Sequence, residues 1–288
     1  MPRNLAVPAI MEVLTILQTL SSSRGEWPHT ASSARGEKTL EEIRAYWNEH
    51  IHDLAIARHP AGSREFFDEL EAYRFEKLDY LPRVVDFTAY EGQALLEVGC
   101  GVGTDLLRFG RNGAVVTGID LAEVSIDLAR KNFESHGVSG DLRMMNGEKL
   151  EFDDASFDVV YAHGVLQYAR DAASIVGELH RVLKPGGEAI LMVYNRYSWL
   201  SLLSMVSGVR LEHEDAPAFK MYSIPEFKGL LSRFSKVEVI PERFPVRTRL
   251  HRGGLAAVYN AAFVSAFNLV PRPLVRPFGW HLMAKAVK

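Results

Sequence analysis

A glycine-rich segment with an acidic residue in front of it has the most informative spacing in the sequence. Residues 95–104 read LLEVGCGVGT, so three glycines alternate with other residues and Glu97 stands two positions before the first glycine. Glycine lets the backbone approach a ligand closely, and a helix that begins here presents unpaired N–H groups to that ligand. The segment therefore predicts a loop that binds a nucleotide-like cofactor. Its G-x-G-x-G spacing differs from the G-x-G-x-x-G of dinucleotide-binding loops.

A second carboxylate follows the next apolar segment. Asp120 comes directly after residues 115–119 (VVTGI), 17 positions beyond Gly103. A carboxylate at the carboxyl end of a strand can accept hydrogen bonds from both hydroxyls of a ribose. The alternative is a structural role, in which Asp120 caps the helix that is expected to begin near Ala122.

Together with three later segments, these motifs resemble those of class I S-adenosylmethionine (SAM)-dependent methyltransferases, whose first motif is E/D-x-G-x-G-x-G. The later segments are 146–158 (NGEKLEFDDASFD), 161–168 (YAHGVLQY) and 181–187 (RVLKPGG), and the resemblance covers about residues 90–195. Within this class the sequence resembles the group that includes the ubiquinone and menaquinone biosynthesis methyltransferases. The resemblance implies SAM as the cofactor and S-adenosylhomocysteine (SAH) as its product.

The resemblance also implies which residues bind the cofactor. Asp120 would hold the ribose, and Asn146 stands where an aspartate usually contacts the adenine amino group. An amide oxygen can accept the same hydrogen bond. The implied cofactor-binding residues lie in four loops: Glu97, Gly99, Cys100, Gly101, Gly103, Asp120, Leu121, Asn146, Gly147, Glu148 and His163.

The catalytic residues are harder to assign, because methyl transfer is an in-line displacement that depends mainly on alignment in a dry pocket. A base is needed only if the attacking atom must first lose a proton, and the candidates are His163, His50, His52 and Tyr194. We favour His163 as a polar wall of the cofactor site. The acceptor pocket is expected to contain polar and aromatic side chains from three segments: Tyr46, His50, Gln167, Tyr168, Tyr197 and Trp199.

Regular alternation of short apolar runs with amphipathic stretches begins at Gln93 and predicts a parallel sheet covered on both faces. Strands are expected at 94–98, 114–119, 142–145, 157–162, 188–194, 236–240 and 280–287. Helices are expected at about 39–54, 66–80, 104–111, 122–135, 171–183 and 224–234, the fifth of them closed by Pro185-Gly186-Gly187. The predicted fold class is α/β, with a doubly wound, mostly parallel, seven-stranded Rossmann-like sheet, an N-terminal helical cap and helical lid inserts.

The chain is expected to divide into four parts along its length. These are a flexible N-terminal tail (1–37), a helical cap (38–90), the SAM-binding core (91–195) and the rest of the sheet (196–288). The last part contains two apolar and aromatic inserts, 196–223 and 243–279, which favour a lid over an acceptor that is partly apolar. The alternative for the inserts is a homodimer interface or a patch that contacts a membrane surface.

Charge is distributed unevenly along the chain. The 288 residues have a formal net charge of −3, yet no acidic residue follows Glu242. The basic residues after this point are Arg243, Arg247, Arg249, Arg252, Arg272, Arg276, Lys285 and Lys288. We expect this basic C-terminal segment either to meet an anionic acceptor or membrane surface, or simply to neutralise the acidic remainder.

Composition excludes several classes of protein. Hydrophobic residues make up 47% and charged residues 24% of the chain, which excludes a disordered or collagen-like protein. The single cysteine, Cys100, excludes an intrachain disulfide and favours a cytoplasmic location, and no metal site is predicted. No run of 18 apolar residues predicts a membrane span. Residues 5–20 favour a loosely attached amphipathic helix over a signal peptide, because Glu12 interrupts the apolar run.

The sequence therefore predicts a methyltransferase that acts on a small, partly apolar molecule. A quinone-like or lipid acceptor at a membrane surface is an option within that class. The alternatives are an NAD-type oxidoreductase and a non-catalytic SAM-binding protein. A nucleic-acid partner is not expected, because the loop after residues 157–162 lacks the Asn/Asp-Pro-Pro-aromatic motif of enzymes that methylate base amino groups. The acceptor atom stays open among oxygen, nitrogen, carbon and sulfur.

Overall fold

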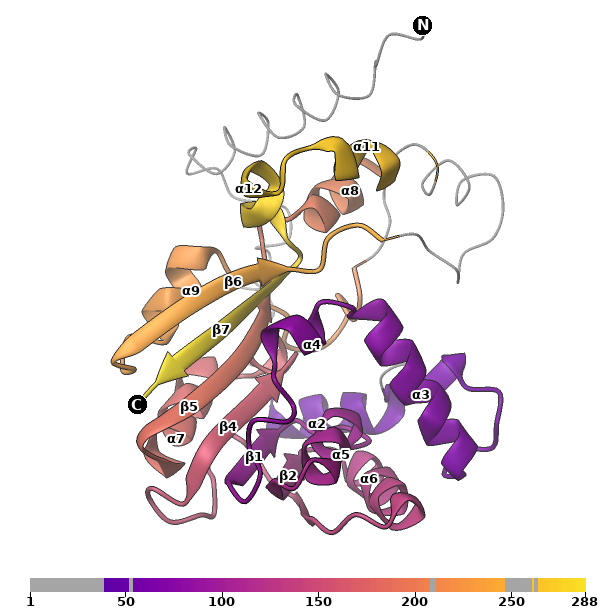
Figure 1. The fold of residues 1–288 in the computed structure, drawn as a ribbon, viewed down its shortest axis with the longest axis vertical. Coiled ribbons are helices and arrows are strands. Elements are labelled where there is room, and N and C mark those ends of the chain that lie inside the picture. Colours follow the sequence, from indigo (N-terminus) through magenta and orange to yellow (C-terminus); the bar gives the residue numbers. More distant parts are fainter. Residues whose placement is uncertain (1–38, 52–53, 208–210, 247–260, 262–263) are drawn as a thin grey trace, which may run out of the picture.

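A sheet of seven strands forms the centre of the computed structural model, which describes residues 39–51, 54–207, 211–246, 261 and 264–288 (Figure 1). The strand order in this part of the chain is β3-β2-β1-β4-β5-β7-β6. The strands are β1 (Ala94–Val98), β2 (Val115–Asp120), β3 (Asp141–Met144), β4 (Phe157–His163), β5 (Leu183–Tyr194), β6 (Lys236–Glu242) and β7 (His281–Val287). Strands β1 to β5 pair in parallel, and β7 is antiparallel to both neighbours. The predicted doubly wound, mostly parallel sheet is confirmed.

Helices cover both faces of this sheet, as predicted. Their bounds are α2 (Leu40–Glu49), α3 (Arg64–Lys77), α4 (Leu81–Val84), α5 (Thr104–Arg111), α6 (Glu123–His136), α7 (Ala172–Val182), α8 (Trp199–Ser207), α9 (Ile224–Leu230), α11 (Val264–Leu269) and α12 (Arg272–Val275). Successive strand residues point to opposite faces, so Leu95 packs with Phe109 of α5, whereas Leu96 belongs to the cluster of Leu179 in α7 and Phe227 in α9. Burial on both faces explains why these strands read as continuous apolar runs.

The chain order of the strands reverses at β1, which lies between β2 and β4. In open α/β sheets this reversal leaves a crevice beyond the carboxyl ends of the strands, where ligands bind. The glycine-rich segment follows β1, and Asp120 ends β2. The topology therefore brings both predicted cofactor motifs to the crevice.

Several predicted helix ends are wrong. Helix α9 ends at Leu230 instead of Phe234, and α7 also ends earlier than predicted. The helix ends at Val182, and Leu183 is already extended and paired with Phe157, so the Pro185-Gly186-Gly187 turn belongs to β5. A shift of register between Phe157 and Val159 accommodates the turn. A Cβ on Gly187 would lie 2.7 Å from the carbonyl oxygen of Asp158, so this residue is a glycine because the two backbones approach closely.

The cap helices also differ in length from their predictions. Helix α2 begins after Thr39, which forms a reciprocal capping box with Glu42, and it ends at Glu49 instead of near Leu54. Helix α3 covers Arg64–Lys77 instead of 66–80. A short 3₁₀ turn at Leu54–Ile56 lies between the two helices.

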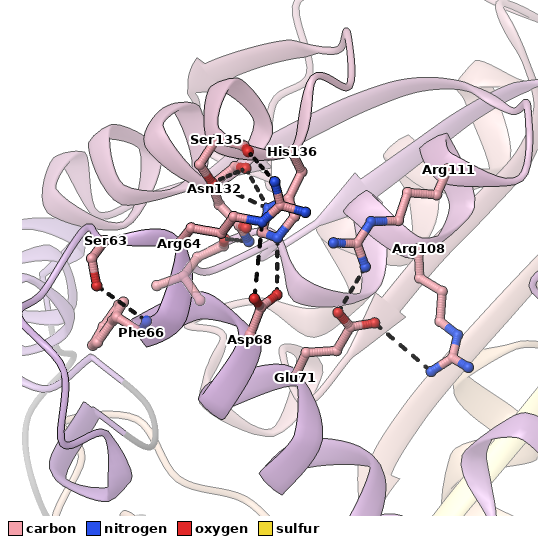
Figure 2. Close-up of polar contacts among 11 residues, drawn as sticks. Ser63, Arg64, Phe66, Asp68, Glu71, Arg108, Arg111, Asn132, Ser135 and His136 are labelled. Atoms are coloured by element: carbon pink, nitrogen blue, oxygen red, sulfur yellow. Dashed lines mark hydrogen bonds and ion pairs between the residues drawn. The ribbon is translucent and has the colours of Figure 1, made fainter.

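Ionic and hydrogen-bonded contacts fasten α3 to α5 and α6 (Figure 2). The Asp68 carboxylate lies 3.0 Å from Nε2 of His136 at the end of α6, and Glu71 accepts a 2.8 Å contact from Arg111 at the end of α5. Arg64 donates a long hydrogen bond of 3.5 Å to the Ser135 carbonyl. These contacts fix the position of α3 over the core, and therefore of the charged side chains in its last turn.

The segments that follow β5 and β6 leave the sheet at the same edge. Both strands are antiparallel to β7, so they run in the same direction, and the second insert also leaves the sheet on the side of the crevice. Helices α8, α11 and α12 gather beyond that edge (Figure 1) and share an apolar cluster that includes Leu202, Phe267 and Val275. In the part of the chain that the structure describes, every helix is too short or too polar to cross a bilayer. The predicted tail (1–37) and residues 247–260 lie outside the described residues.

Candidate functional site

A cavity of about 240 Å³ lies at the carboxyl ends of β1, β2 and β4. One part of its wall comes from the glycine turn after β1, from Asp120 and from the loop 145–148 after β3. The other part comes from α2, α3, the loop after β4 and the segments that follow β5 and β6. The cavity thus joins the predicted cofactor loops to residues that are distant in sequence.

The glycine turn needs glycine for two separate reasons. All three glycines have a positive φ, with values of 70° at Gly99, 52° at Gly101 and 77° at Gly103. A Cβ on Gly99 would lie 2.3 Å from a methyl carbon of Val165, whereas the same atom on Gly101 would meet nothing within 4 Å. Gly101 therefore offers open backbone to a ligand in the cavity. Gly103 does not line the cavity, because its missing Cβ faces the ring of Phe133 and it begins α5.

The carboxylate of Asp120 is held by backbone N–H groups from the glycine turn and from the start of α6. One carboxylate oxygen accepts a 2.9 Å hydrogen bond from the N–H of Gly101, and the other accepts a 2.9 Å bond from the N–H of Ala122. Burial raises the pKa of Asp120 above its ordinary value, although these N–H groups act in the opposite direction. The side chain therefore supports the start of α6 and also lines the cavity.

Glu97 supplies a buried carboxylate that is incompletely satisfied. Its side chain is 4% exposed, and Oε2 has no hydrogen-bond partner among the described residues. Burial, and then the charge of Asp105, raises the pKa of Glu97 well above its usual range. A buried acceptor without a partner is costly, so this cavity wall is suited to a ligand that brings a positive charge or a donor.

The loop after β3 is ordered by its own side chains. Asn146 accepts a 3.0 Å hydrogen bond from the N–H of Glu148, which orients its amide at the cavity wall. The Glu148 carboxylate pairs with Arg170 and accepts a 2.9 Å bond from the N–H of Asp171. Cys100 is buried, and burial raises the pKa of its thiol, so it is no nucleophile.

A directed chain of hydrogen bonds ends at His163. Arg243 can only donate, so Nε2 of His281, 2.8 Å away, accepts and Nδ1 carries the proton. That Nδ1–H donates over 2.6 Å to the hydroxyl of Tyr80, which in turn donates over 3.1 Å to Nε2 of His163. Burial, followed by the charge of Arg74, lowers the pKa of His163 to about 3. His163 is therefore a neutral group whose Nε2 lone pair is already occupied.

The structure brings together most of the residues predicted for the site. All the predicted cofactor residues except Gly103 line the cavity, and so do His163, Tyr168 and Tyr194. Burial raises the pKa of Tyr194, which keeps its hydroxyl protonated. His52 lies outside the described residues.

Several predicted acceptor residues do not line the cavity. His50 stacks on the ring of Tyr46 at 4.1 Å, and the Tyr46 hydroxyl instead donates to Asp215 over 3.1 Å. Gln167 is fully buried, because its short 3₁₀ turn packs against the sheet. The remaining two, which the lid interpretation placed over the acceptor, pack in the apolar cluster with α11 and α12: Tyr197 and Trp199.

Sequence reasoning missed six ionisable residues of the cavity wall, which come from α3, α5, β7 and the segments that follow β5 and β6. They are Arg74, Lys77, Asp105, Glu212, Arg243 and His281. They are separated by up to about two hundred residues, and no local motif connects them. The one available signal was the basic segment after Glu242, since Arg243 is its first residue.

Comparison with known proteins agrees with the fold and the cavity. Residues 96–191 match the methyltransferase domain family. A ubiquinone biosynthesis O-methyltransferase of Pseudomonas paraeruginosa is 32% identical over 152 residues, which cover 51% of this chain and 66% of that relative. A sterol 24-C-methyltransferase of Gibberella zeae is 37% identical over 114 residues, 38% of this chain and 28% of that protein.

Solved structures share the fold at low sequence identity. A SAM-dependent methyltransferase from Thermotoga maritima aligns with a TM-score of 0.56 at 17% identity, over 85% of this chain and 99% of that one. A protein from Pyrococcus horikoshii aligns with a TM-score of 0.55 at 16% identity, over 84% and 98% of the two chains. The family match shows that residues 96–191 form a methyltransferase domain, and the fold of the chain is that of solved class I SAM-dependent methyltransferases. The alternatives of an NAD-type oxidoreductase and a non-catalytic SAM-binding protein are not favoured.

Proposed function

We propose that this chain transfers the methyl group of SAM to a hydroxyl oxygen of a small aromatic acceptor. The observation that carries the proposal is the single cavity that joins the glycine turn and Asp120 to an aromatic wall of Trp47, Tyr168 and Tyr194. The relative from Pseudomonas paraeruginosa is named as an O-methyltransferase, which favours oxygen among the acceptor atoms that the sequence left open.

The cofactor half of the cavity has the donors and acceptors that SAM requires. The unpartnered oxygen of Glu97 suits the ammonium group of the methionine part, and the open backbone at Gly101 leaves room beside it. Asp120 and Asn146 line this half of the cavity, where Asp120 would accept hydrogen bonds from the ribose hydroxyls and Asn146 would contact the adenine. When bound, SAM supplies an electrophilic methyl group on a sulfonium, for which the nearby carboxylates are favourable.

The acceptor half favours alignment over proton transfer. Tyr194 stays protonated, and His163 is neutral with its Nε2 occupied by Tyr80. These groups form a polar wall that orients the acceptor and excludes water, as in other displacements whose leaving group is already good. We therefore assign no general base to His163, in agreement with the wall interpretation. The acceptor hydroxyl would lose its proton to bulk water before the acceptor binds, and the oxygen–carbon bond would then form as the sulfur–carbon bond breaks and leaves neutral SAH.

The test is a methyl-transfer assay with isotope-labelled SAM and a panel of mono- and dihydroxybenzenes. We expect label on oxygen in at least one phenol and none on the matched anilines. Label on the anilines alone, or no label in a protein that binds SAH, would contradict transfer to oxygen. A quinone-like acceptor, membrane contact through the basic C-terminal segment, a homodimer and a cytoplasmic location stay predictions.

A further inference from the structure

The hydroxyl proton of Tyr194 has no acceptor at a normal hydrogen-bonding distance among the described residues. The hydroxyl contacts that of Tyr168, but the two oxygens are 3.5 Å apart. Hydrogen bonds between hydroxyl groups are usually about 2.5–3.0 Å long. The Tyr168 proton is used elsewhere, because it is donated over 3.0 Å to the carbonyl oxygen of Glu212, which can only accept. The Tyr194 proton is therefore available to a ligand.

Tyr194 is placed where an acceptor would meet the cofactor half of the cavity. It ends β5 and lines the cavity. Met192, two residues earlier on the same face of the strand, also lines the cavity and pairs with His163 at the end of β4. The ring of Tyr194 lies 6.0 Å from that of Tyr168, measured between centroids. Tyr194 thus adjoins both the end of β4 and the aromatic wall.

Packing fixes the ring of Tyr194 before any ligand binds. The indole of Trp280, which is fully buried, stacks on it with centroids 4.4 Å apart and planes 21° apart. The imidazole of His281 stacks on it more loosely, at 5.5 Å and 28°. A donor that is already in position needs little reorganisation when charge develops beside it.

A second buried polar group near Tyr194 also lacks a partner. The side chain of Gln167 is fully buried, and neither atom of its amide has a hydrogen bond of regular geometry among the described residues. Its Nε2 would lie 3.5 Å from a Cβ on Gly164, which lines the cavity. Burial raises the pKa of Tyr194, and the amide of Gln167 acts in the opposite direction, as a donor that faces the phenolic oxygen does. This contact directs the Tyr194 proton away from Gln167.

The charged groups around Tyr194 leave its hydroxyl protonated. After burial, the carboxylate of Glu212 raises the pKa of Tyr194 further, whereas Arg243 lowers it. His281 is neutral, because burial and then the charge of Arg243 lower its pKa well below the ordinary value. Tyr194 is therefore a hydrogen-bond donor at neutral pH and not a base.

We propose that the hydroxyl of Tyr194 donates a hydrogen bond to the attacking oxygen of the acceptor, and that Gln167 is a positioning residue for this hydroxyl. The acceptor oxygen is a phenolate, since its proton has already gone to bulk water. The new oxygen–carbon bond forms as the sulfur–carbon bond breaks, and Tyr194 keeps its proton throughout. The donor thus increases the ionised fraction of the bound acceptor in a site without a base. This inference rests on the proposed function and names the residue that recognises the reacting atom.

The test is a pH titration of 4-nitrophenol bound to the SAH-saturated protein, because the phenol and the phenolate of this probe differ in absorbance. We expect the pKa of the bound probe to be higher in Tyr194→Phe than in the wild-type protein by about 1 or more, as for the loss of one hydrogen bond to a charged oxygen. An equal pKa of the bound probe in the two proteins, or no binding of the probe to the wild-type protein, overturns the inference.

Two further variants separate this role from a structural one. Tyr222→Phe is the matched control, because it removes a buried hydroxyl that contacts the Leu166 carbonyl over 3.4 Å and does not line the cavity. It should leave the pKa of the probe unchanged, and a rise as large as in Tyr194→Phe would overturn the inference. Gln167→Met should raise the pKa of the probe by a smaller amount without lowering the Tm, since two unpaired polar atoms leave the interior. An unchanged pKa of the probe in this variant would overturn the positioning role of Gln167.

The methyl-transfer assay separates this inference from the proposed function. Absence of label in every phenol of the panel would refute the proposed function. Label on a phenol, together with the same pKa of the bound probe in the wild-type protein and in Tyr194→Phe, would refute only the role of Tyr194.

Discussion

Glu97 keeps one carboxylate oxygen without a hydrogen-bond partner among the described residues, in a buried position that suits a positively charged ligand. The raised pKa of Glu97 means that the empty protein favours the protonated form more than the unfolded chain does. The associated stability is complete below the ordinary pKa of 4.5 and is lost as pH rises through the folded value. A bound ammonium group would reverse the preference.

Replacing Glu97 by glutamine tests whether this carboxylate lowers the stability of the ligand-free protein and strengthens cofactor binding. We expect Glu97→Gln to raise the Tm of the ligand-free protein at neutral pH and to have little effect below pH 4.5, where Glu97 is protonated in both states. We expect SAH to bind about tenfold more weakly or worse, because the charge partner is lost. Thermal unfolding and calorimetry measure the two effects. An unchanged SAH affinity would show that Glu97 does not contact the cofactor.

His163 provides a second prediction for a single residue. A general base contributes about 10²- to 10⁴-fold to a rate, whereas a polar wall contributes much less. We expect His163→Gln to retain kcat within about tenfold of wild type, because Nε2 already accepts from Tyr80. The wild-type pH–rate profile should show no protonation of this group near 6.5, since its pKa is about 3. A loss of about a thousandfold would restore His163 as the base.

Local sequence patterns predicted the strands and helices of the core well, because the residue pattern within each segment indicates its structure. The glycines with positive φ, Asp120 at the end of β2 and the apolar strands depend on contacts near in sequence. The end of α7 was wrong because Leu183 is fixed by pairing with Phe157 on another strand. The packing of Trp199 with α11 and α12, away from the cavity, depends on apolar contacts that no local spacing encodes.

The N-terminal cap is joined to the first insert by a small set of side-chain contacts. Tyr46 in α2 donates to Asp215 over 3.1 Å and lies 3.1 Å from Nδ1 of His213. The next residue, Trp47, packs on Tyr168 in the cavity. The contacts connect two elements that both line the cavity, so the closure of the acceptor half depends on them.

Removal of one hydroxyl tests this connection. We expect Tyr46→Phe to speed amide exchange in α2 and to weaken acceptor binding by roughly fivefold, the equivalent of about 1 kcal/mol for one hydrogen bond. Tyr90→Phe is the matched control, because its hydroxyl also donates to a carboxylate, that of Glu188 in β5, but this bond involves neither α2 nor the first insert. Hydrogen exchange measures both variants. Equal exchange in α2 of the two variants would contradict a role for Tyr46 in closure.

The whole molecule supplies what no single motif contains, namely a charged wall assembled from distant segments. Lys77, Glu212 and Arg243 come from the cap and from the two inserts, and they meet because β5 and β6 end at the same edge of the sheet. The uneven charge of the sequence did not indicate where these residues would meet. The sequence could therefore name most of the residues that line the cavity near the glycine turn, but the other part of the cavity only as a region.

The central claim is that the cavity beside the glycine turn binds SAM. Calorimetric titration of SAH into the wild-type protein and into Asp120→Ala tests it most directly, with NADH as the competing ligand. We predict one SAH site per chain in the wild-type protein, at least about tenfold weaker binding in Asp120→Ala, and no binding of NADH. Binding of NADH without SAH, or an SAH affinity that does not change in Asp120→Ala, would contradict the account.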